Sequence, residues 1–430
     1  MYDSIETADR TELCDLQSKR LRSVLERAYE SVPFYRDRLD EVGIQPGTIG
    51  DIDAIERLPL TTSDAFRSSY PDGLFAVEWD DIQRIHASSG TTGRPKIVGY
   101  TDGDLERWGS VMARSFVAAG VSVDEIVQNA YGYGLFTGGL GFHDGGEALG
   151  ATVIPVGGGN TARQIDLLCE LESDALACTP SYCLYLAEAL DERGVDPSSL
   201  ALSTVLIGAE PFTEPLRAEI EEKLDVTAID VYGLSEIIGP GVSIECDHQN
   251  GLHIWEDHFY PEIIDPETGM VLPDGETGEL VLTTLTKVAQ PVLRYRTGDI
   301  TSLTRERCAC GRTHARMAPI TGRTDDLLII RGVNVYPSQI EDALLSVNSV
   351  APHYRIDCHR DGQLDRLTIT VERTPERSGT AETIEADIRT ELSRALELTP
   401  DEIDIVSPGT IERTETGKVQ RVFDHRNGDP

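Results

Sequence analysis

Short apolar runs alternate with amphipathic stretches through the first half of the chain. The runs at 151–156, 203–209 and 226–233 are separated by helix-like stretches at 162–171 and 214–224. Buried parallel strands read as continuous apolar runs, and the connections between them are helices. The pattern therefore predicts an α/β fold, with a large multi-layer N-terminal domain that contains parallel sheets.

The pattern changes twice along the rest of the chain. From about residue 251 strands and turn residues predominate, which predicts a strand-rich subdomain. A smaller unit is predicted after Gly322, with its own run of elements: a strand at 326–332, a helix at 338–347, a pair of strands around Asp361 and Gly362, a helix at 383–398 and a strand at 402–406. We predict an N-terminal domain over 1–321, a hinge over 322–325 and a small α+β C-terminal domain over 326–430.

The charge balance of the chain predicts what kind of surface and partners the protein has. The 430 residues include 74 Asp and Glu but only 38 Lys and Arg, for a net charge of −36. Nucleic-acid binding needs clustered Lys and Arg, so we expect no nucleic-acid partner. Only five of the cations are lysines, at positions 19, 96, 223, 287 and 418. This balance is typical of a halophilic protein, and the alternative is an acidic protein adapted to ordinary salt.

Membrane and secretion signals are not expected in this sequence. The first ten residues contain acids and no apolar core, and no apolar run approaches the roughly 20 residues that span a bilayer. We expect a cytoplasmic protein without a membrane partner. The eight cysteines are too sparse for a disulfide scaffold. Four of them, in helix-like or strand-like segments, are predicted to be buried thiols: Cys14, Cys169, Cys178 and Cys183.

The loop SSGTTGRPK at 88–96 has the composition of a phosphate cradle. Its two glycines let the backbone approach a ligand closely, its hydroxyls add donors, and Arg94 and Lys96 add positive charge. The pattern is not that of a Walker loop, and a plain surface turn is the alternative. At about 1 M salt the Debye length is only ~3 Å, so the acidic surface would not repel an anion at long range. The predicted phosphate-binding residues are Ser88, Ser89, Gly90, Thr91, Thr92, Gly93 and Lys96.

Three cysteines and a histidine predict a structural zinc site. Cys308 and Cys310 form a C-x-C-G half-site, and Cys246 with His253 supplies the other half. His248 or His314 could take the place of His253. The alternative is two reduced cysteines in a turn.

Five further motifs follow the loop in order: GAEP (208–211), DVYGLSE (230–236), YRTGDI (295–300), GRTDDLLIIRG (322–332) and ERTETGK (412–418). Together they resemble the adenylate-forming superfamily, and the segments 129–161, 245–259 and 327–341 resemble the phenylacetate–CoA ligase family. The resemblance implies that ATP activates a carboxylate to an acyl-adenylate, from which the thiolate of CoA displaces AMP. It also implies a mobile C-terminal lid and Mg²⁺.

The resemblance assigns roles to individual residues. Lys418 would be the catalytic lysine that bridges the carboxylate and the α-phosphate, Glu236 would help to hold Mg²⁺, and Asp299 would hold the ribose. Arg323 would contact the nucleotide, although an interdomain ion pair would explain it equally well. The other residues assigned to the nucleotide are Gly208, Ala209, Glu210, Asp230, Tyr232 and Gly233.

The lid and the acid pocket are assigned in the same way. Asp325 would be the hinge about which the lid rotates, bringing Arg331 and Gly332 against the pantetheine arm of CoA. The predicted acid pocket would hold a flat ring between aromatic walls; core packing is the alternative for its aromatic residues. Its members are Tyr131, Tyr133, Phe136, Ala209 and Ile237.

Three functions fit these motifs to different degrees. The first is an aryl-acid CoA ligase, above all for phenylacetate, for which the resemblance also allows a homodimer. The second is an adenylyltransferase that modifies a deazaflavin hydroxyl without CoA, and CoA-dependent release of AMP separates these two. The third is a non-catalytic nucleotide sensor, which would have no use for Lys418.

Overall fold

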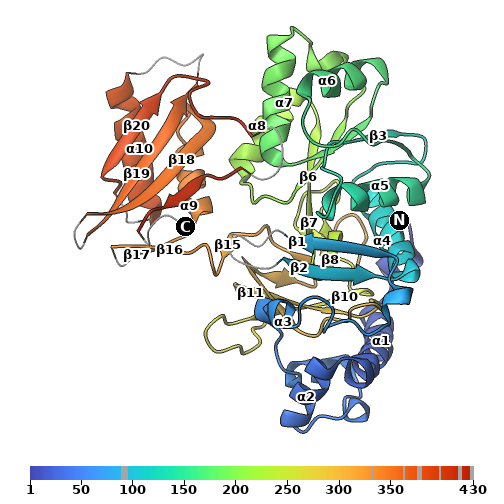
Figure 1. Ribbon diagram of the computed structural model, residues 1–430. Helices are drawn as coiled ribbons and strands as arrows, with labels where there is room; N and C mark the ends of the chain where they lie inside the picture. The colour runs from blue at the N-terminus through green and yellow to red at the C-terminus, as the bar shows by residue number, and fades with distance from the viewer. Residues whose placement is uncertain are drawn as a thin grey trace. The chain divides into compact units, whose positions relative to one another are not determined.

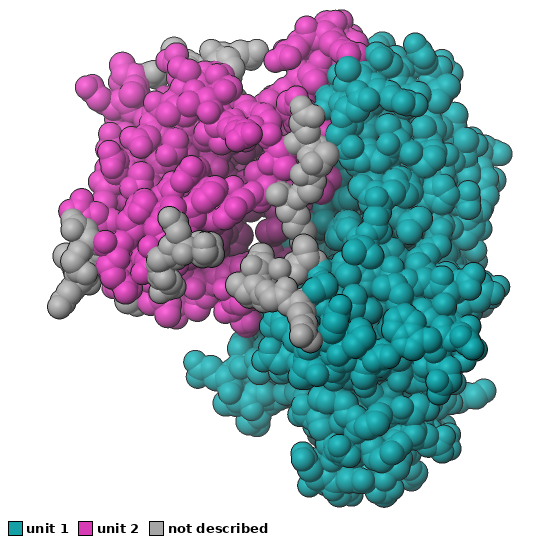
Figure 2. All heavy atoms as spheres, in the orientation of Figure 1, with its two compact units in different colours: residues 1–178, 199–209, 227–319 teal, residues 179–198, 210–226, 320–430 magenta. Residues whose placement is uncertain are grey.

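A computed structural model describes residues 1–88, 95–331, 333–361, 364–374, 380–396, 399–414 and 419–426. The chain divides into two compact units, which Figure 2 colours separately. Unit 1 comprises 1–178, 199–209 and 227–319, and unit 2 comprises 179–198, 210–226 and 320–430. Two segments between residues 179 and 226 therefore group with the C-terminal part of the chain. No helix among the described residues is both long and apolar enough to cross a membrane.

The largest sheet of unit 1 has nine strands in the order β13-β14-β9-β8-β7-β6-β5-β3-β4. Strands β3 to β7 pair in parallel, and the others pair antiparallel along one side. The apolar runs predicted as strands are β4, β6 and β7, so the predicted parallel α/β layer is confirmed. The strands are β3 (Ile126–Asn129), β4 (Thr152–Ile154), β5 (Ala175–Cys178), β6 (Thr204–Gly208), β7 (Thr227–Leu234), β8 (Ile238–Ile244), β9 (Leu252–Ile254), β13 (Leu303–Thr304) and β14 (Arg316–Met317).

Unit 1 also contains a hairpin and a smaller sheet (Figure 1). The hairpin joins β1 (Arg84–Ser88) to β2 (Lys96–Tyr100), with Ser88 opposite Lys96. The smaller sheet pairs β10 (Phe259–Ile264), β11 (Gly278–Thr284) and β12 (Tyr295–Thr301) antiparallel in that order. These strands confirm the strand-rich region predicted from residue 251 onward.

The helices of unit 1 bring a glycine-rich segment onto the large sheet. Helices α4 and α5 pack on each other and on β8. A Cβ atom at Gly145 would stand 2.3 Å from Cβ of Met112, so α5 needs glycine to approach α4 this closely. The loop that leads into α5 is thereby fixed beside the sheet. The helices are α1 (Arg10–Ser31), α2 (Pro33–Glu41), α3 (Ser63–Ser68), α4 (Asp102–Ala118), α5 (Gly138–Leu149) and α6 (Thr161–Glu170).

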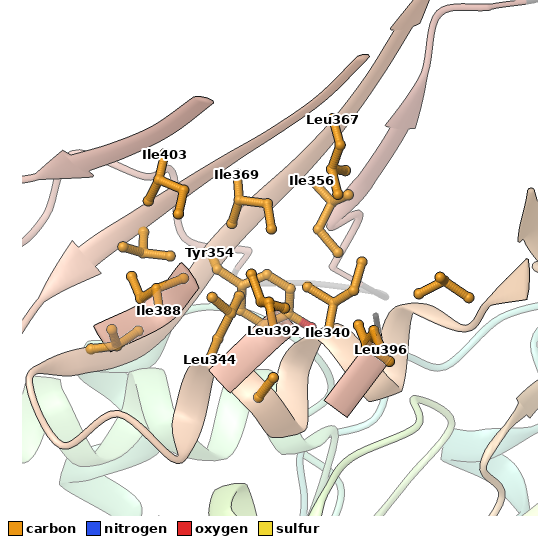
Figure 3. Packing of buried hydrophobic residues seen from close by; sticks show 14 of the residues in the cluster. Ile340, Leu344, Tyr354, Ile356, Leu367, Ile369, Ile388, Leu392, Leu396 and Ile403 are labelled. Atoms are coloured by element: carbon orange, nitrogen blue, oxygen red, sulfur yellow. The ribbon is translucent and has the colours of Figure 1, made fainter. Parts of the chain in front are cut away.

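Unit 2 has a sheet in the order β20-β19-β18-β21, covered by two helices (Figure 3). Apolar side chains of α9 and α10, such as Ile340 and Leu392, pack against Ile356 and Ile369 of the sheet. The strands and helices predicted after Gly322 are confirmed, and β21 was not predicted. The elements of the unit are α7 (Pro180–Glu192), α8 (Glu214–Leu224), β15 (Gly322–Arg323), β16 (Leu328–Ile330), β17 (Val333–Val335), α9 (Pro337–Leu345), β18 (Val350–Asp361), β19 (Leu364–Arg373), α10 (Ala381–Leu396), β20 (Glu402–Val406) and β21 (Val422–Asp424).

The predicted burial of four cysteine thiols is half right. Cys178 and Cys183 are buried, whereas Cys169 is exposed and Cys14 is only partly buried. Each of these last two follows a buried leucine in its helix, Leu168 in α6 and Leu13 in α1. Successive helical residues point about 100° apart, so the neighbour of a buried residue can turn away from the core.

Candidate functional site

The hairpin β1–β2 presents the ends of the predicted phosphate loop. Residues 89–94, which include most of that loop, lie outside the described residues. The loop at 132–137 is tied to β1, because the carbonyl oxygen of Leu135 accepts a hydrogen bond from Ala87 N and lies 3.0 Å from Nδ1 of His86. The first strand of the hairpin and the glycine-rich loop therefore share one side of unit 1.

A buried carboxylate stands at the same end of the hairpin, beside Lys96. Glu236, just after β7, pairs with the ammonium of Lys96 through Oε1, and the same oxygen accepts a hydrogen bond of 3.1 Å from Tyr295 Oη. The structure thus brings together two predicted site residues 140 positions apart in the chain. Tyr295 lies within the YRTGDI motif, but no spacing along the chain connects it to Glu236.

Lys287 holds the backbone at Glu236, and it was not identified from the sequence as a site residue. Its buried Nζ donates hydrogen bonds to the carbonyl oxygens of Ile237 (3.0 Å) and Glu236 (3.4 Å). The ammonium also stands 4.6 Å from the ring centre of Tyr100, in a cation–π contact. Burial lowers the pKa of Lys287 to about 7, whereas the charges of Asp104 and Glu236 act to raise it.

The turn that carries Lys287 is itself anchored. The carboxylate of Asp104 accepts hydrogen bonds from the backbone amides of Val288 (2.7 Å) and Ala289 (2.8 Å). Gln290 bridges to β2, because its Oε1 accepts from Gly99 N at 3.2 Å and its Nε2 donates to the carbonyl of Ile97 at 3.3 Å. The turn at 287–290 therefore connects β2, which begins with Lys96, to the backbone at Glu236.

A second predicted pair meets across strands β7 and β12. Tyr232 Oη donates a hydrogen bond of 2.6 Å to Oδ2 of the buried Asp299. Gly298 has a φ of +82°, so the Thr-Gly-Asp turn needs a glycine at this position. Asp230 also lies on β7, where its backbone amide donates to Glu245, and Gly233 is the residue after Tyr232. The two strands thus give Asp299 a fixed orientation.

The end of β6 is tightly packed and strained. A Cβ atom at Gly208 would lie 2.1 Å from the carbonyl oxygen of Val231, so only glycine fits here. Ala209 follows with a φ of +69°, a left-handed conformation that costs a non-glycine residue of order 1 kcal/mol or more. Such strain is concentrated at functional sites.

The predicted acid-pocket residues fall into two groups. Tyr131 and Ile237 are buried, and the ring of Tyr131 stacks on Phe142 at 4.9 Å between ring centres. By contrast Tyr133 and Phe136 are 37% and 42% exposed on unit 1, and Leu135 between them, which was not among the predicted residues, is 61% exposed. Exposed apolar clusters of this kind mark ligand or partner sites.

This loop packs directly against the residues that follow Glu236. A Cβ atom at Gly239 would stand 1.8 Å from Oγ1 of Thr137, which leaves no room for any other residue there. The apolar cluster at 133–136 is therefore held beside the start of β8.

Unit 2 carries the remaining predicted residues that the structure describes. Glu210 accepts hydrogen bonds from Val419 N (2.7 Å) and Ser181 N (3.3 Å). Arg323 pairs with Asp325, the predicted hinge residue, at 2.9 Å. Arg331 has a φ of +52° and donates to the carbonyl oxygen of Thr399. Gly332 and Lys418 lie outside the described residues.

The predicted metal ligands of unit 1 form one cluster. Ligand atoms of Cys246, His253, Cys308 and Cys310 all lie within 4.8 Å of one another. Cys246 Sγ lies 3.8 Å from Cys308 Sγ, and Cys310 Sγ lies 3.5 Å from His253 Nε2.

Comparison with known proteins gives consistent matches over the whole chain. Residues 18–287 match the AMP-binding enzyme family, and residues 332–426 match the AMP-binding enzyme C-terminal domain family. The chain is 49% identical to a phenylacetate–coenzyme A ligase from Thermus thermophilus over 99% of its own length and 100% of the relative.

The fold is also similar to solved structures of a 2-hydroxyisobutyryl-CoA ligase. The TM-score is 0.92, at 29% identity, to its postadenylation state with R3-HIB-AMP. It is 0.73, at 30% identity, to its thioesterification state with 2-HIB-AMP and CoA. Both alignments cover 98% of this chain and 91% of the other.

Proposed function

This chain belongs to the phenylacetate–coenzyme A ligase family of AMP-binding enzymes, and from that membership we propose that it converts an aryl acid, above all phenylacetate, to its CoA thioester. ATP is cleaved to AMP and pyrophosphate in the process. The observation that carries most weight in the structure is the buried Glu236, paired with Lys96 at the end of the hairpin that presents the phosphate loop.

The reaction has two steps, and each balances without a further reactant. In the first, a carboxylate oxygen of the acid attacks the α-phosphorus of ATP, and pyrophosphate leaves to give the aryl-acyl-adenylate. In the second, the CoA thiolate attacks the acyl carbon and AMP leaves. Two anions must meet in the first step, so cationic groups have to offset the charge that gathers there. Lys96 and Lys418 are the lysines we assign to this task.

Nucleotide binding is assigned to the two strands that meet at Asp299. The hydrogen bond from Tyr232 fixes the carboxylate so that its oxygens can accept from two ribose hydroxyls. The strained Ala209 and the close packing at Gly208 suit a backbone that approaches a flat adenine.

The donor set at Glu236 fits a hard divalent cation. The carboxylate is buried and already has a cation, the ammonium of Lys96, at Oε1. Carboxylate oxygens together with nucleotide phosphates are the usual ligands of Mg²⁺. Bound Mg²⁺ would neutralise phosphate charge, and Glu236 is the residue of this chain that we assign to hold it.

The acid is assigned to the loop at 132–137 and the start of β8. Tyr133 and Phe136 expose their rings, and Ile237 lies next to Glu236 in the chain. Aromatic and aliphatic walls suit a phenyl ring better than a polar or long flexible acid.

The lid proposal places the hinge at 322–325, between residues 1–321 and 326–430. Rotation about Asp325 would withdraw Lys418 and bring Arg331 and Gly332 to CoA. The pair of Arg323 with Asp325 supports a hinge that is locally ordered. The similar 2-hydroxyisobutyryl-CoA ligase has been solved in a postadenylation state and in a thioesterification state. This supports a lid that takes a different position in each of the two steps.

The function is tested by a substrate panel. We expect ATP-dependent pyrophosphate release with phenylacetate that exceeds release with benzoate, 2-aminobenzoate, indoleacetate and octanoate, and AMP plus thioester only when CoA is present. The panel is run at ~2 M and ~0.1 M KCl, because screening of the acidic surface predicts activity at high salt. Pyrophosphate release that needs no acid but requires a deazaflavin would overturn the ligase proposal. Full activity at the lower salt concentration would overturn the prediction that the protein is halophilic.

Lys287→Met is expected to slow adenylate formation about tenfold or more, since it removes both hydrogen bonds from the ammonium to the carbonyl oxygens of Glu236 and Ile237. A positioning role predicts a weaker apparent affinity for Mg²⁺ and ATP, while the acid KM stays within about twofold. Lys287→Arg, which keeps the charge, is expected to restore part of the rate. Lys223→Met, on the exposed side of α8, is the matched control. Equal losses in all three variants would contradict the positioning role.

A further inference from the structure

Four soft donors gather where β8, β9 and β14 meet at one side of the large sheet of unit 1. Cys246 comes two residues after β8, His253 lies in β9, and Cys308 and Cys310 lie between β13 and β14. His253 is paired in register with Ile244 of β8 and with Arg316 of β14. The strand pairing therefore brings together ligands that lie up to 64 positions apart in the chain, counted from Cys246 to Cys310.

Two of the separations between donor atoms match the edges of a tetrahedron around zinc. With Zn–S bonds of about 2.3 Å and a Zn–N bond of about 2.0 Å, the edges of the tetrahedron are about 3.8 Å between two sulfurs and about 3.5 Å between sulfur and nitrogen. The observed separations are 3.8 Å for Cys246 Sγ to Cys308 Sγ and 3.5 Å for Cys310 Sγ to His253 Nε2. A disulfide would require about 2.0 Å, and all the cysteines are free.

The local backbone also suits a metal knuckle. Gly311 N donates to the carbonyl oxygen of Cys308 at 2.9 Å, and the φ of +96° at Gly311 turns the chain back. Cys308 N donates to the carbonyl oxygen of Arg312 at 3.1 Å, which closes the turn around Cys310. The guanidinium of Arg312 pairs with the buried Glu6 at 2.6 Å and so holds the end of this turn in place. Contacts around the ligands of this kind orient them for a metal ion.

The two alternative histidines, His248 and His314, are not available as the fourth ligand. His314 lies within hydrogen-bond distance of backbone atoms through both ring nitrogens, with Nδ1 3.2 Å from Glu256 N and Nε2 3.1 Å from the carbonyl oxygen of Ile5. His248 is exposed and stands outside the cluster. His253 is buried, with Nε2 turned toward Cys310.

We propose that Cys246, His253, Cys308 and Cys310 bind one structural Zn²⁺ ion that fastens the β13–β14 segment to β8 and β9. Four protein ligands fill the tetrahedron, so the ion has no open position for a substrate and contributes to folding rather than to the reaction. The site is independent of the ligase function proposed above, since none of its ligands is assigned to ATP, the acid or CoA.

The first measurement uses the unmodified chain, purified without a histidine tag and without chelator. We expect about one equivalent of zinc by plasma mass spectrometry, released when an organomercurial titrates the thiols and detected by a metallochromic dye. Replacement by Co²⁺ should give thiolate charge-transfer bands and the intense d–d absorption of tetrahedral cobalt. Zinc below about a tenth of an equivalent, with no uptake of Zn²⁺ or Co²⁺ after reduction, would overturn the proposal. Iron in place of zinc would also overturn it.

Matched serine variants test the ligand set. Cys310→Ser is expected to lose most of the zinc and to lower the Tm, whereas Cys169→Ser, an exposed cysteine outside the cluster, should keep both at wild-type values. His253→Cys, which offers a fourth thiolate, should retain zinc even if Cys310→Ser fails to fold. Wild-type zinc in a soluble Cys310→Ser protein would contradict the assignment. Because metal content and Tm are read without substrate, failure here leaves the ligase test untouched.

Discussion

A Glu236→Gln variant is expected to form the aryl-adenylate about 100-fold more slowly than the wild-type chain, a loss of roughly 3 kcal/mol in transition-state stabilisation. Glutamine keeps the shape of the side chain and an oxygen that can accept from Tyr295, so the fold and the Tm should change little. It removes the negative charge that attracts Mg²⁺ and pairs with Lys96. The cost should therefore fall on the chemical step and on metal affinity.

The measurement is pyrophosphate release with phenylacetate over a series of Mg²⁺ concentrations. The apparent affinity for Mg²⁺ should weaken together with the rate, while thioester formation from synthetic phenylacetyl-adenylate and CoA should fall much less. Glu106→Gln, an exposed carboxylate of α4, is the matched control and should behave as wild type. A wild-type rate and Mg²⁺ dependence in Glu236→Gln would show that the charge of this carboxylate serves neither the metal nor the reaction.

The fold was predictable where burial is continuous. Strand β6 has almost entirely buried residues, so its apolar run stands out in the sequence. The order of the strands was not predictable, because an apolar run says that a strand is buried and not which strand lies beside it. The three residues of β21 are too few to give any period. Amphipathic helices such as α8 likewise show that one face is covered without showing by what.

The site was predictable where its residues form a local motif, and not where contacts join distant segments. Glu236 and Asp299 belong to short signatures. Tyr295 and Lys287 reach Glu236 from 59 and 51 positions away, and no spacing in the chain marks those contacts. One feature of the sequence could have identified Lys287, because lysine is rare in this chain. In a chain with five lysines, each is a candidate for a task that arginine cannot perform.

The cysteine cluster was likewise predictable from its local motif and not from its contacts between distant segments. The spacing C-x-C-G predicted half of a metal site, and the other half could be completed by any of three histidines. The choice depends on register, because pairing of β9 with both neighbours turns His253 inward and a shift of one residue would turn it away. Register comes from tertiary packing, so only the structure separates His253 from His248 and His314.

Lys418 lies outside the described residues, but both flanks of its segment are anchored within unit 2. On one side Arg413 pairs with Glu372 at 2.9 Å and with Glu188 of α7 at 3.2 Å. On the other side Val419 donates to Glu210 at 2.7 Å. Burial would raise the pKa of Glu188, but the hydrogen bond and charge of His353, together with Arg413, lower it to about 2. The carboxylate therefore stays charged and holds its partners at neutral pH.

These contacts join Arg413 and Val419, the described residues on either side of the segment, to α7 and to Glu210 within unit 2. From the role assigned to Lys418, Lys418→Ala is expected to slow adenylate formation by about 1,000-fold, as loss of a preorganised charge at the transferring phosphoryl group does. In the second step the proposed hinge has moved that residue away. Thioester formation from synthetic phenylacetyl-adenylate and CoA should accordingly stay within about twofold of wild type.

The two half-reactions are measured separately, pyrophosphate exchange for the first and thioester absorbance for the second. Lys223→Ala, which removes an exposed lysine, is the matched control for charge. A split between the half-reactions would mean that one ammonium serves only the adenylation state, which requires the lid to move between steps. Equal losses in both would mean that Lys418 supports the structure of the lid or acts in both steps, and the rotation about Asp325 would lose its main support.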